Sequence, residues 1–237
     1  EQACESFEAL VDDEQQPADT RCAAALGLSR AWQQRGLWDV AAQVVDAELE
    51  RTPGAADLLA RRGELQFLRG EYEAAGASVQ AALAIDGEHL LARLTAAHLA
   101  AEGGDFDEAL EGYRWFVRYY NREQPTKAPS LLLVGEGSLQ YARWKSVSAI
   151  FDFVINTLAV DALADDERCW QASWMAGELL LEKYNKPQAQ AEFAAALAVN
   201  PRAAEVIVAQ GRAALVDHEL EDAIDLLLAR KISGLPV

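Results

Sequence analysis

Apolar residues recur at intervals of three and four positions along most of the chain, in short blocks that glycines and polar residues separate. This spacing places the apolar side chains on one face of a helix. Between residues 56 and 89, Leu59 and Phe67 mark one amphipathic helix, and Val79 marks a second. Gly70 lies between the two helices, where a glycine permits a tight turn. The pattern therefore predicts a helix–turn–helix unit.

This unit is repeated along the chain. Gly36, Gly70 and Gly104 are spaced by 34 residues, and an aromatic residue, an alanine and a larger apolar residue follow each glycine in the same register. The same interval separates Gly177 from Gly211. Such a period is typical of repeat proteins in which each helix pair buries its apolar face against its neighbours. The sequence thus predicts an all-α protein built as an α-solenoid.

By this register, about six helix pairs follow an N-terminal capping helix and linker at residues 1–21. We expect the pairs at residues 22–55, 56–89, 90–129, 130–169, 170–203 and 204–237. The third and fourth pairs are longer than the period, and we place their extra residues at Arg122–Pro129 and around Asp161–Asp166. Pro125 and Pro129 predict that the first of these segments is a loop. We favour a tolerated insertion there over a functional elbow that would change the curvature.

Gly63 lies inside a predicted helix, although glycine lowers helix stability. A glycine or alanine lets two paired helices approach each other closely, and this gain can exceed the propensity loss of about 1 kcal/mol. We therefore expect Gly63 to lie at a close crossing, with Ala75 as the complementary small residue on the second helix.

The fifth unit carries a more specific pattern of small and large residues in fixed order: Ala176, Gly177, Leu180, Ala189, Phe193, Ala196, Asn200 and Pro201. These residues resemble the tetratricopeptide repeat (TPR) family. Ser173 departs from the family pattern, which most often has tryptophan there, and Trp174 follows one position later. The resemblance implies a right-handed superhelix whose first helices line a concave groove that binds a peptide or protein.

The positions that face this groove in the family can be transferred to the present sequence. They include Val134 and Ser138, and the candidate binding residues are Arg30, Glu64, Phe67, His98, Glu102, Tyr141, Trp174, Glu178, Glu182 and Arg212. Acidic side chains outnumber basic ones, and Tyr141 and Trp174 offer large contact areas. We therefore expect a basic or neutral partner with apolar anchors. Alternatively, Tyr141 and Trp174 only pack between repeats, and the acidic residues only keep the surface soluble.

Composition and charge narrow the choice of partner. Alanine and leucine, both strong helix formers, make up about a third of the chain. The net charge of −17 repels phosphate backbones and anionic lipid, which disfavours nucleic acid as a partner. No apolar stretch approaches the roughly 20 residues that span a bilayer, so we expect no membrane insertion.

Motifs that carry catalytic or metal chemistry are missing from the sequence. Gly135-Glu136-Gly137 is a fragment of a dinucleotide fingerprint, but it lacks the third glycine and lies in a predicted helix. The histidines are scattered: His98 could be a polar contact in the groove, whereas His89 and His218 fall at unit junctions, where surface or capping roles fit better than metal binding. We expect no enzymatic activity, no cofactor and no metal.

Cysteine and methionine bear on processing and compartment. Cys4, Cys22 and Cys169 are widely spaced, which predicts buried free thiols rather than disulfides or a zinc site. Met175 is the only methionine and the sequence begins at Glu1, so we expect the natural initiator to lie upstream. The compartment stays open, with the cytoplasm slightly favoured over an extracytoplasmic location.

The last predicted helix is apolar on more than one face, with Leu220, Ile224 and the run Leu226–Leu228. Solenoid ends need polar caps. We expect this end to be covered by self-association or by a downstream domain. The leading hypothesis is a non-enzymatic interaction scaffold or adaptor, and the alternative is the recognition arm of a longer enzyme or of a secretion or assembly component.

Overall fold

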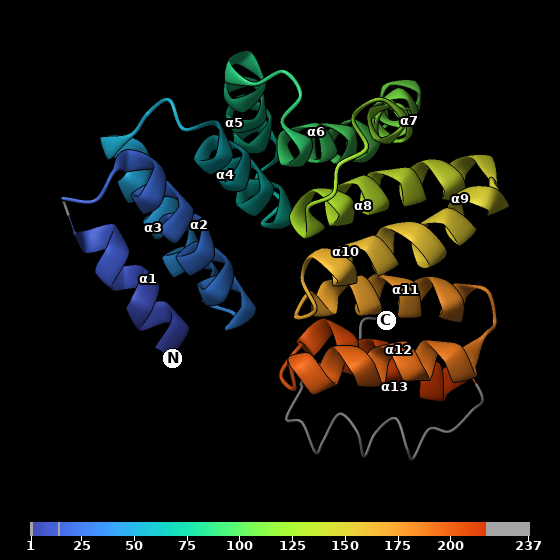
Figure 1. Cartoon of the computed structure of the whole chain (residues 1–237). Helices are drawn as coiled ribbons and strands as arrows, with labels where there is room; N and C mark the ends of the chain where they lie inside the picture. The colour runs from blue at the N-terminus through green and yellow to red at the C-terminus, as the bar shows by residue number, and fades with distance from the viewer. Residues whose placement is uncertain (1, 14, 217–237) are drawn as a thin grey trace. The chain divides into compact units, whose positions relative to one another are not determined.

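The structure is a computed structural model that describes residues 2–13 and 15–216, and within these ranges every regular element is a helix (Figure 1). The predicted all-α solenoid of helix pairs is confirmed. The protein divides into two compact units, Glu1–Trp115 and Phe116–Val237, with the boundary inside α7, and each unit is described by itself. The number of repeats and the handedness of the superhelix stay predictions.

Unit 1 contains a single leading helix and then helix pairs. Its elements are α1 (Gln2–Asp12), α2 (Ala18–Gln34), α3 (Trp38–Arg51), α4 (Ala56–Leu68), α5 (Tyr72–Ile85), α6 (Leu90–Glu102) and the first part of α7 (Phe106–Glu123). Gly36, Gly70 and Gly104 form the turns within the pairs, with φ of +77°, +77° and +81°. A residue with a side chain would be strained in this left-handed region, which explains why glycine recurs at these turns.

Glycine also permits close helix packing in unit 1. A Cβ on Gly63 would lie 2.8 Å from Cγ2 of Val79 and 3.4 Å from the carbonyl oxygen of Ala75, so α4 and α5 cross closely at this point, as predicted. A Cβ on Gly27 would meet the ring of Phe7 at 2.7 Å, so this ring packs directly onto the backbone of α2. Helix α1 therefore packs against α2.

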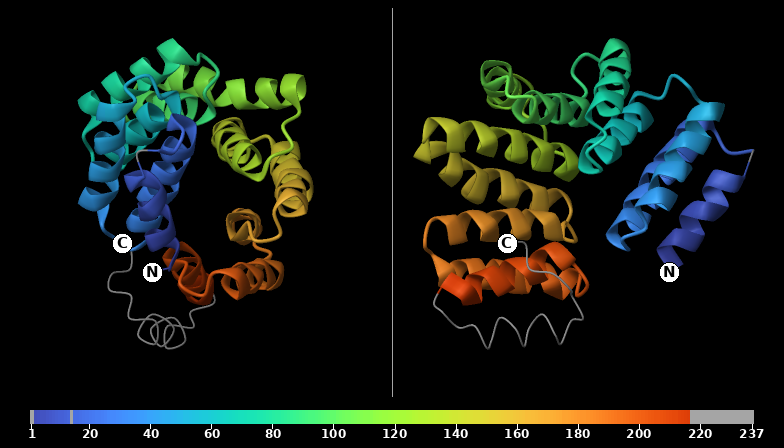
Figure 2. Two further views of the ribbon diagram at one scale, coloured as in Figure 1. Left: turned by 60° about the vertical axis from the view of Figure 1, so that its left-hand side comes forward. Right: turned by 180° about the vertical axis from the view of Figure 1, so that it is seen from behind.

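Unit 2 continues with further helices. Its elements after α7 are α8 (Ala128–Lys145), α9 (Ser148–Phe153), the π-helical turn η1 (Val154–Leu158), α10 (Ala159–Asp165), α11 (Trp170–Glu182), α12 (Lys186–Val199) and α13 (Ala204–Val216). The backbone stays helical from α9 through η1 to α10, so these three segments form one continuous helix that pairs with α8. The views in Figures 1 and 2 agree that α11, α12 and α13 lie side by side.

The extra residues of the third and fourth pairs lengthen helices instead of forming a long loop. Only residues 124–127 separate α7 from α8, and both helices contain 18 residues. Pro129 lies in the first turn of α8, where proline removes an N–H that has no partner in the helix. The carboxylate of Asp165 accepts a hydrogen bond from the backbone N–H of Ala128 at 2.8 Å, which ties the end of α10 to the start of α8.

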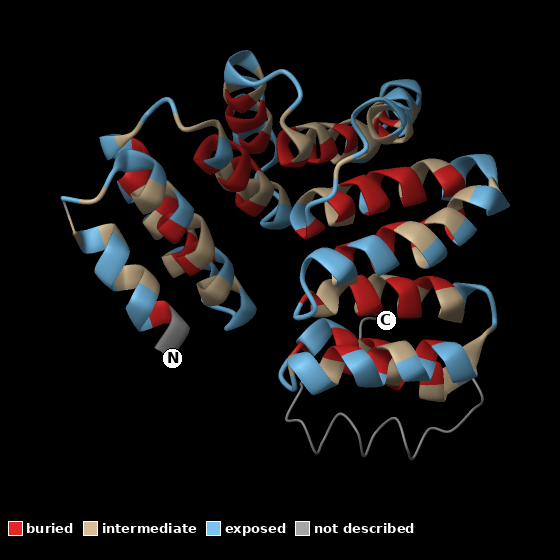
Figure 3. Cartoon of the chain, viewed as in Figure 1, coloured by how far each residue is buried: buried red, intermediate tan, exposed pale blue. Residues whose placement is uncertain are grey.

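Buried residues form the inner faces of the helix pairs, and exposed residues cover their outer faces (Figure 3). At the end of unit 2, the ring of Phe193 is fully buried and approaches Gly177 of α11 closely. Trp174 packs against the same cluster, which α12 and α13 build mostly from alanines. The second helix predicted for the last unit, its apolar face and His218 lie outside the described residues.

Candidate functional site

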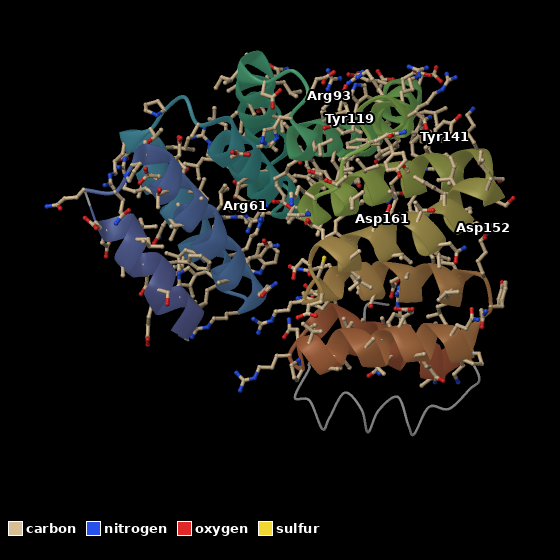
Figure 4. The ribbon with its side chains drawn as sticks, viewed as in Figure 1. Arg61, Arg93, Tyr119, Tyr141, Asp152 and Asp161 are labelled. Carbon is tan, nitrogen blue, oxygen red and sulfur yellow. The ribbon has the colours of Figure 1, made fainter. Side chains whose placement is uncertain are left out.

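The predicted groove residues of unit 1 lie on the first helices of the pairs, and one of them contacts a buried arginine. The side chain of Arg61 on α4 is 2% exposed and donates hydrogen bonds to Ser29 and Gln33 on α2 and to Glu64 on α4. The distance from Arg61 to Glu64 is 2.6 Å. Burial lowers the pKa of the Arg61 guanidinium, and the adjacent Glu64 carboxylate opposes this shift. Arg61 therefore joins α2 to α4 (Figure 4).

An aromatic cluster follows along the same helices. Phe67 stacks on His98 of α6, with ring centroids 5.6 Å apart and planes inclined by 19°. The Nδ1 atom of His98 lies 2.8 Å from the hydroxyl oxygen of Tyr113 in α7. The predicted residues Phe67 and His98 are thus brought together by mutual packing, while Arg30 and Glu102 are exposed on α2 and α6.

His89 confirms the capping role that its position predicted. Its Nδ1 accepts a hydrogen bond from the backbone N–H of Ala92 at the start of α6, and its Nε2 lies 2.9 Å from Oδ1 of Asp57. The hydrogen bond with His89 lowers the pKa of the Asp57 carboxyl. His89 therefore fixes the start of α6 against α4.

In unit 2, two ion pairs join the first helices of successive pairs. Arg143 of α8 pairs with Glu182 of α11, and Arg212 of α13 pairs with Oε2 of Glu178 on α11. Three of the predicted groove residues, Glu178, Glu182 and Arg212, thus contact a partner within the unit. The acidic side chains of α11 are compensated by arginines, which the count of acidic and basic residues along the sequence did not reveal.

Between α8 and α11 lies a surface cleft of about 380 Å³, hereafter the α8–α11 cleft. It is lined by Leu132, Glu136, Leu139, Gln140 and Arg143 of α8 and by Gln171, Trp174, Met175, Glu178 and Leu179 of α11. Apolar side chains form most of the lining, and polar groups border it. This volume falls within the range of small-ligand sites, roughly 300–1,000 Å³.

Trp174 and Glu178 of α11 each have one side-chain polar atom that is buried from solvent and has no hydrogen-bond partner among the described residues. These atoms are the indole Nε1 of Trp174, a donor, and Oε1 of Glu178, an acceptor. An unpaired buried polar group costs about 1–3 kcal/mol, so such groups call for a specific explanation. The two residues are one helical turn apart and share one face of α11.

The remaining predicted residues of unit 2 lie elsewhere on α8. Tyr141 (Figure 4) is half-buried and is not among the residues that line the α8–α11 cleft. Val134 and Ser138 were expected on the groove face, but they are 0% and 1% exposed, so a ligand cannot reach them. Two of the three residues that the family register assigned to the groove face of α8 are therefore buried.

Sequence reasoning missed the α8 wall of the cleft. Its residues follow intervals of four, three, one and three positions, which place Leu132, Glu136 and Gln140 on one face of the helix. This face mixes leucines with polar residues, a signal that the sequence alone contained. This face of α8 lines a cleft only because Met175 and its neighbours on α11 form the opposite wall. The position of α11 cannot be read from the sequence of α8.

Residues 2–13 and 15–216 contain no group of three or more histidine, cysteine or acidic side chains that could hold a metal ion. Across the same residues, no helix has the length and apolar character needed to cross a membrane. The three cysteines are unpaired, and burial raises the pKa of the Cys22 and Cys169 thiols.

Known proteins resemble this one in fold. Residues 26–89 match the family model described as tetratricopeptide repeat. A thermophilic TPR protein of Thermus thermophilus has a TM-score of 0.58 at 20% identity, and the match covers 81% of this chain and 97% of that one. A tetratricopeptide repeat protein of Parabacteroides merdae has a TM-score of 0.54 at 16% identity, with coverage of 98% and 85%. For yeast Tom70 the TM-score is 0.52 at 15% identity, with coverage of 97% and 54%. No curated protein matches the sequence significantly.

Proposed function

We propose that this protein, whose residues 26–89 match the tetratricopeptide repeat model and whose fold resembles solved proteins of that kind, is a non-enzymatic module that binds a peptide or protein segment along the first helices of its pairs. Repeats of this kind generally serve as scaffolds for protein–protein interaction. The partner is basic or neutral and carries apolar anchors. The binding surface in unit 2 is the α8–α11 cleft, with Trp174 as its largest side chain.

The cleft is the observation that supports this proposal best. Trp174 and Met175 give it a large, adaptable apolar lining, and tryptophan is enriched at positions that dominate binding energy. Gln140 and Gln171 border the lining and offer both hydrogen-bond donors and acceptors. A concave apolar surface with a few polar groups at its border is the usual form of a ligand site.

Capture experiments with the full-length protein test this proposal. The protein is immobilised, incubated with native extract and washed, and the bound proteins are identified by mass spectrometry. Leu132→Glu places a charge in the cleft, where its desolvation opposes binding of an apolar anchor. Ile85→Glu is the matched control, because Ile85 is 54% exposed on α5, a second helix of unit 1.

We expect at least one partner that the wild type and Ile85→Glu capture equally and that Leu132→Glu loses. Thermal melting monitored by circular dichroism must first show that both variants are folded. Equal capture by all three proteins would exclude the α8–α11 cleft as the binding surface.

A further inference from the structure

The exposed aromatic side chains of the described residues are all found at one kind of position. They are Trp38, Tyr72, Phe106, Trp144 and Tyr184. Each lies at the turn that joins the two helices of a pair, and none lies at a turn between pairs. Single exposed apolar residues scattered over a surface need no explanation, but exposed apolar residues that gather in one place mark interaction surfaces.

These turns form one edge in each unit. The turns at residues 35–39, 69–73 and 103–108 are hereafter the unit 1 edge, and those at residues 143–147 and 182–186 are the unit 2 edge. Successive pairs repeat the same arrangement, so equivalent turns lie at the same end of the helices. Figure 1 shows both turns of the unit 2 edge at the right-hand end of their helices.

The folding of the chain does not account for Tyr184. Its side chain is 91% exposed, and its φ of 59° lies in the left-handed region. In unit 1 the equivalent position, two residues before the second helix begins, is held by Gly36, Gly70 and Gly104. A residue with a Cβ is strained there, and an exposed ring gains nothing from burial. A contact with a partner explains why a tyrosine occupies this position.

The unit 2 edge is positively charged, although the chain as a whole carries −17. Three of the five lysines of the chain lie in it, namely Lys145, Lys183 and Lys186. Arg143 and Glu182 neutralise each other in an ion pair. The Nζ atom of Lys183 lies 3.9 Å from the ring centroid of Phe151, a contact that leaves its charge in place. This edge therefore attracts an acidic surface that also offers aromatic contacts.

The unit 1 edge has this chemistry. Its acidic residues are all exposed, namely Asp39, Glu71, Glu73, Asp105, Asp107 and Glu108. Only two basic residues, Arg35 and Arg69, belong to the same edge, and Arg69 pairs with Asp39 and Glu71. Each turn of the edge also presents one of the exposed aromatic side chains. The chain itself thus carries the surface that complements its unit 2 edge.

We propose that the unit 2 edge of one copy of this protein binds the unit 1 edge of a second copy. The lysines pair with carboxylates of the second copy, and Trp144 and Tyr184 pack against its aromatic side chains. The net charge of −17 repels two copies in other orientations, which favours this one.

The two edges differ, so the contact is heterologous. Each bound copy keeps an edge that can bind a further copy, and association continues beyond a dimer unless it closes into a ring. The contact does not use the apolar lining of the α8–α11 cleft. The inference therefore goes beyond the proposed function and does not depend on it.

Charge reversal of one edge at a time tests the inference. The unit 2 variant carries Lys145→Glu and Lys183→Glu, and the unit 1 variant carries Glu73→Lys and Asp107→Lys. Sedimentation velocity of the full-length protein measures its average mass from about 5 to about 500 µM in about 150 mM NaCl. Circular dichroism melts must show that every variant is folded.

Two further variants serve as controls. Arg168→Glu with Arg202→Glu changes the net charge as much as the unit 2 variant does, but both arginines are exposed at turns between pairs. Tyr184→Gly removes the exposed ring and relieves the left-handed strain, so the variant should be at least as stable as the wild type. A purely structural role of Tyr184 would leave association unchanged.

We expect the average mass of the wild type to rise with concentration to species larger than a dimer. Each charge-reversed variant alone should associate at least about tenfold more weakly, and the arginine control should match the wild type within about twofold. An equimolar mixture of the two variants should form a dimer and stop there, because each variant keeps one intact edge. Tyr184→Gly should weaken association about tenfold.

Several results would overturn the inference. A wild type that stays monomeric at the highest concentration would exclude self-association. Variants that associate like the wild type would place the interface elsewhere in the chain, and equal weakening by the arginine control would show an effect of net charge alone. A mixture of the two variants that forms no dimer would show that the two edges do not bind each other. None of these results would affect the proposed function of the cleft.

Discussion

Two glycines on α8 allow the effect of side-chain packing on stability to be measured separately from the effect of helix propensity. Replacing Gly135 or Gly137 by alanine adds the same methyl group inside the same helix, and each change should gain roughly 0.5–1 kcal/mol from propensity. The added Cβ meets different neighbours at the two positions. At Gly135 it would lie 2.9 Å from Cε and Sδ of Met175, and at Gly137 it would overlap the ring of Phe116.

These neighbours differ in their ability to move. The Met175 side chain is flexible and half-buried at the α8–α11 cleft, so its end can shift by a few tenths of an ångström at little cost. The Phe116 ring is 0% exposed and cannot yield without displacing the core around it. Overpacking of this kind costs about 1–3 kcal/mol, and the severe overlap at Gly137 places it at the upper end. The net loss for Gly137→Ala is therefore about 2 kcal/mol, and the net change for Gly135→Ala is near zero.

Thermal and urea unfolding monitored by circular dichroism would measure both changes. For a protein of this size, about 2 kcal/mol corresponds to a decrease in melting temperature of roughly 4–8 °C for Gly137→Ala. Gly135→Ala should stay within about 2 °C of the wild type and still alter peptide affinity, because it displaces Met175 at the cleft. A Gly135→Ala variant as unstable as Gly137→Ala, or the reverse order, would refute this reasoning.

Three further predictions concern buried and titrating groups. Arg61→Ala should lower the free energy of unfolding by about 2–3 kcal/mol in urea titrations, because the substitution leaves Glu64 without its partner and opens a cavity. The control Arg69→Ala removes an exposed ion pair and should change the free energy of unfolding by about 0.5 kcal/mol or less. The hydrogen bond from Ala128 lowers the pKa of Asp165, so the stabilisation by this carboxylate is present above its unfolded pKa of about 4 and is lost as the pH falls through the lower, folded pKa. Asp165→Asn should therefore be less stable than the wild type at pH 7, and melts at decreasing pH should show the difference closing below about pH 4. Burial raises the pKa of the Cys169 thiol, so iodoacetamide at pH 8 should modify it more slowly than free cysteine; equal rates by mass spectrometry would contradict its burial.

The fold was predictable from the sequence wherever the structure depends on local chemistry. The left-handed turns at Gly36 and Gly70 need glycine, so their spacing directly reveals the repeat. The close crossing at Gly63 follows from the same argument on small residues. The segment Arg122–Pro129 was misjudged, because proline breaks a helix interior but suits its first turn, and Pro129 occupies the first turn of α8.

The π-helical turn η1 could not be predicted by local propensity. The helix that pairs with α8 must hold more residues than the period allows, and the wider turn at Val154–Leu158 accommodates part of this surplus. Surplus residues can equally enter a loop or lengthen a helix end. The choice depends on contacts such as the one between Asp165 and Ala128, which bring together residues 37 positions apart.

The charge of the candidate site also depends on ion pairs between residues that are far apart in the sequence. The spacing of these paired residues follows the repeat period. Arg212 and Glu178 are 34 positions apart, the length of one repeat, and Arg143 and Glu182 are 39 positions apart across the longer fourth pair. Residues one repeat apart occupy equivalent places on adjacent first helices, so opposite charges at that interval are placed to pair. Counting acidic residues along the groove overestimates its charge unless each is first compared with the residue one repeat away. For α11, this comparison pairs Glu178 with Arg212 and Glu182 with Arg143. Because these charges are compensated, hydrogen bonding and apolar contact are the main determinants of what the cleft can bind.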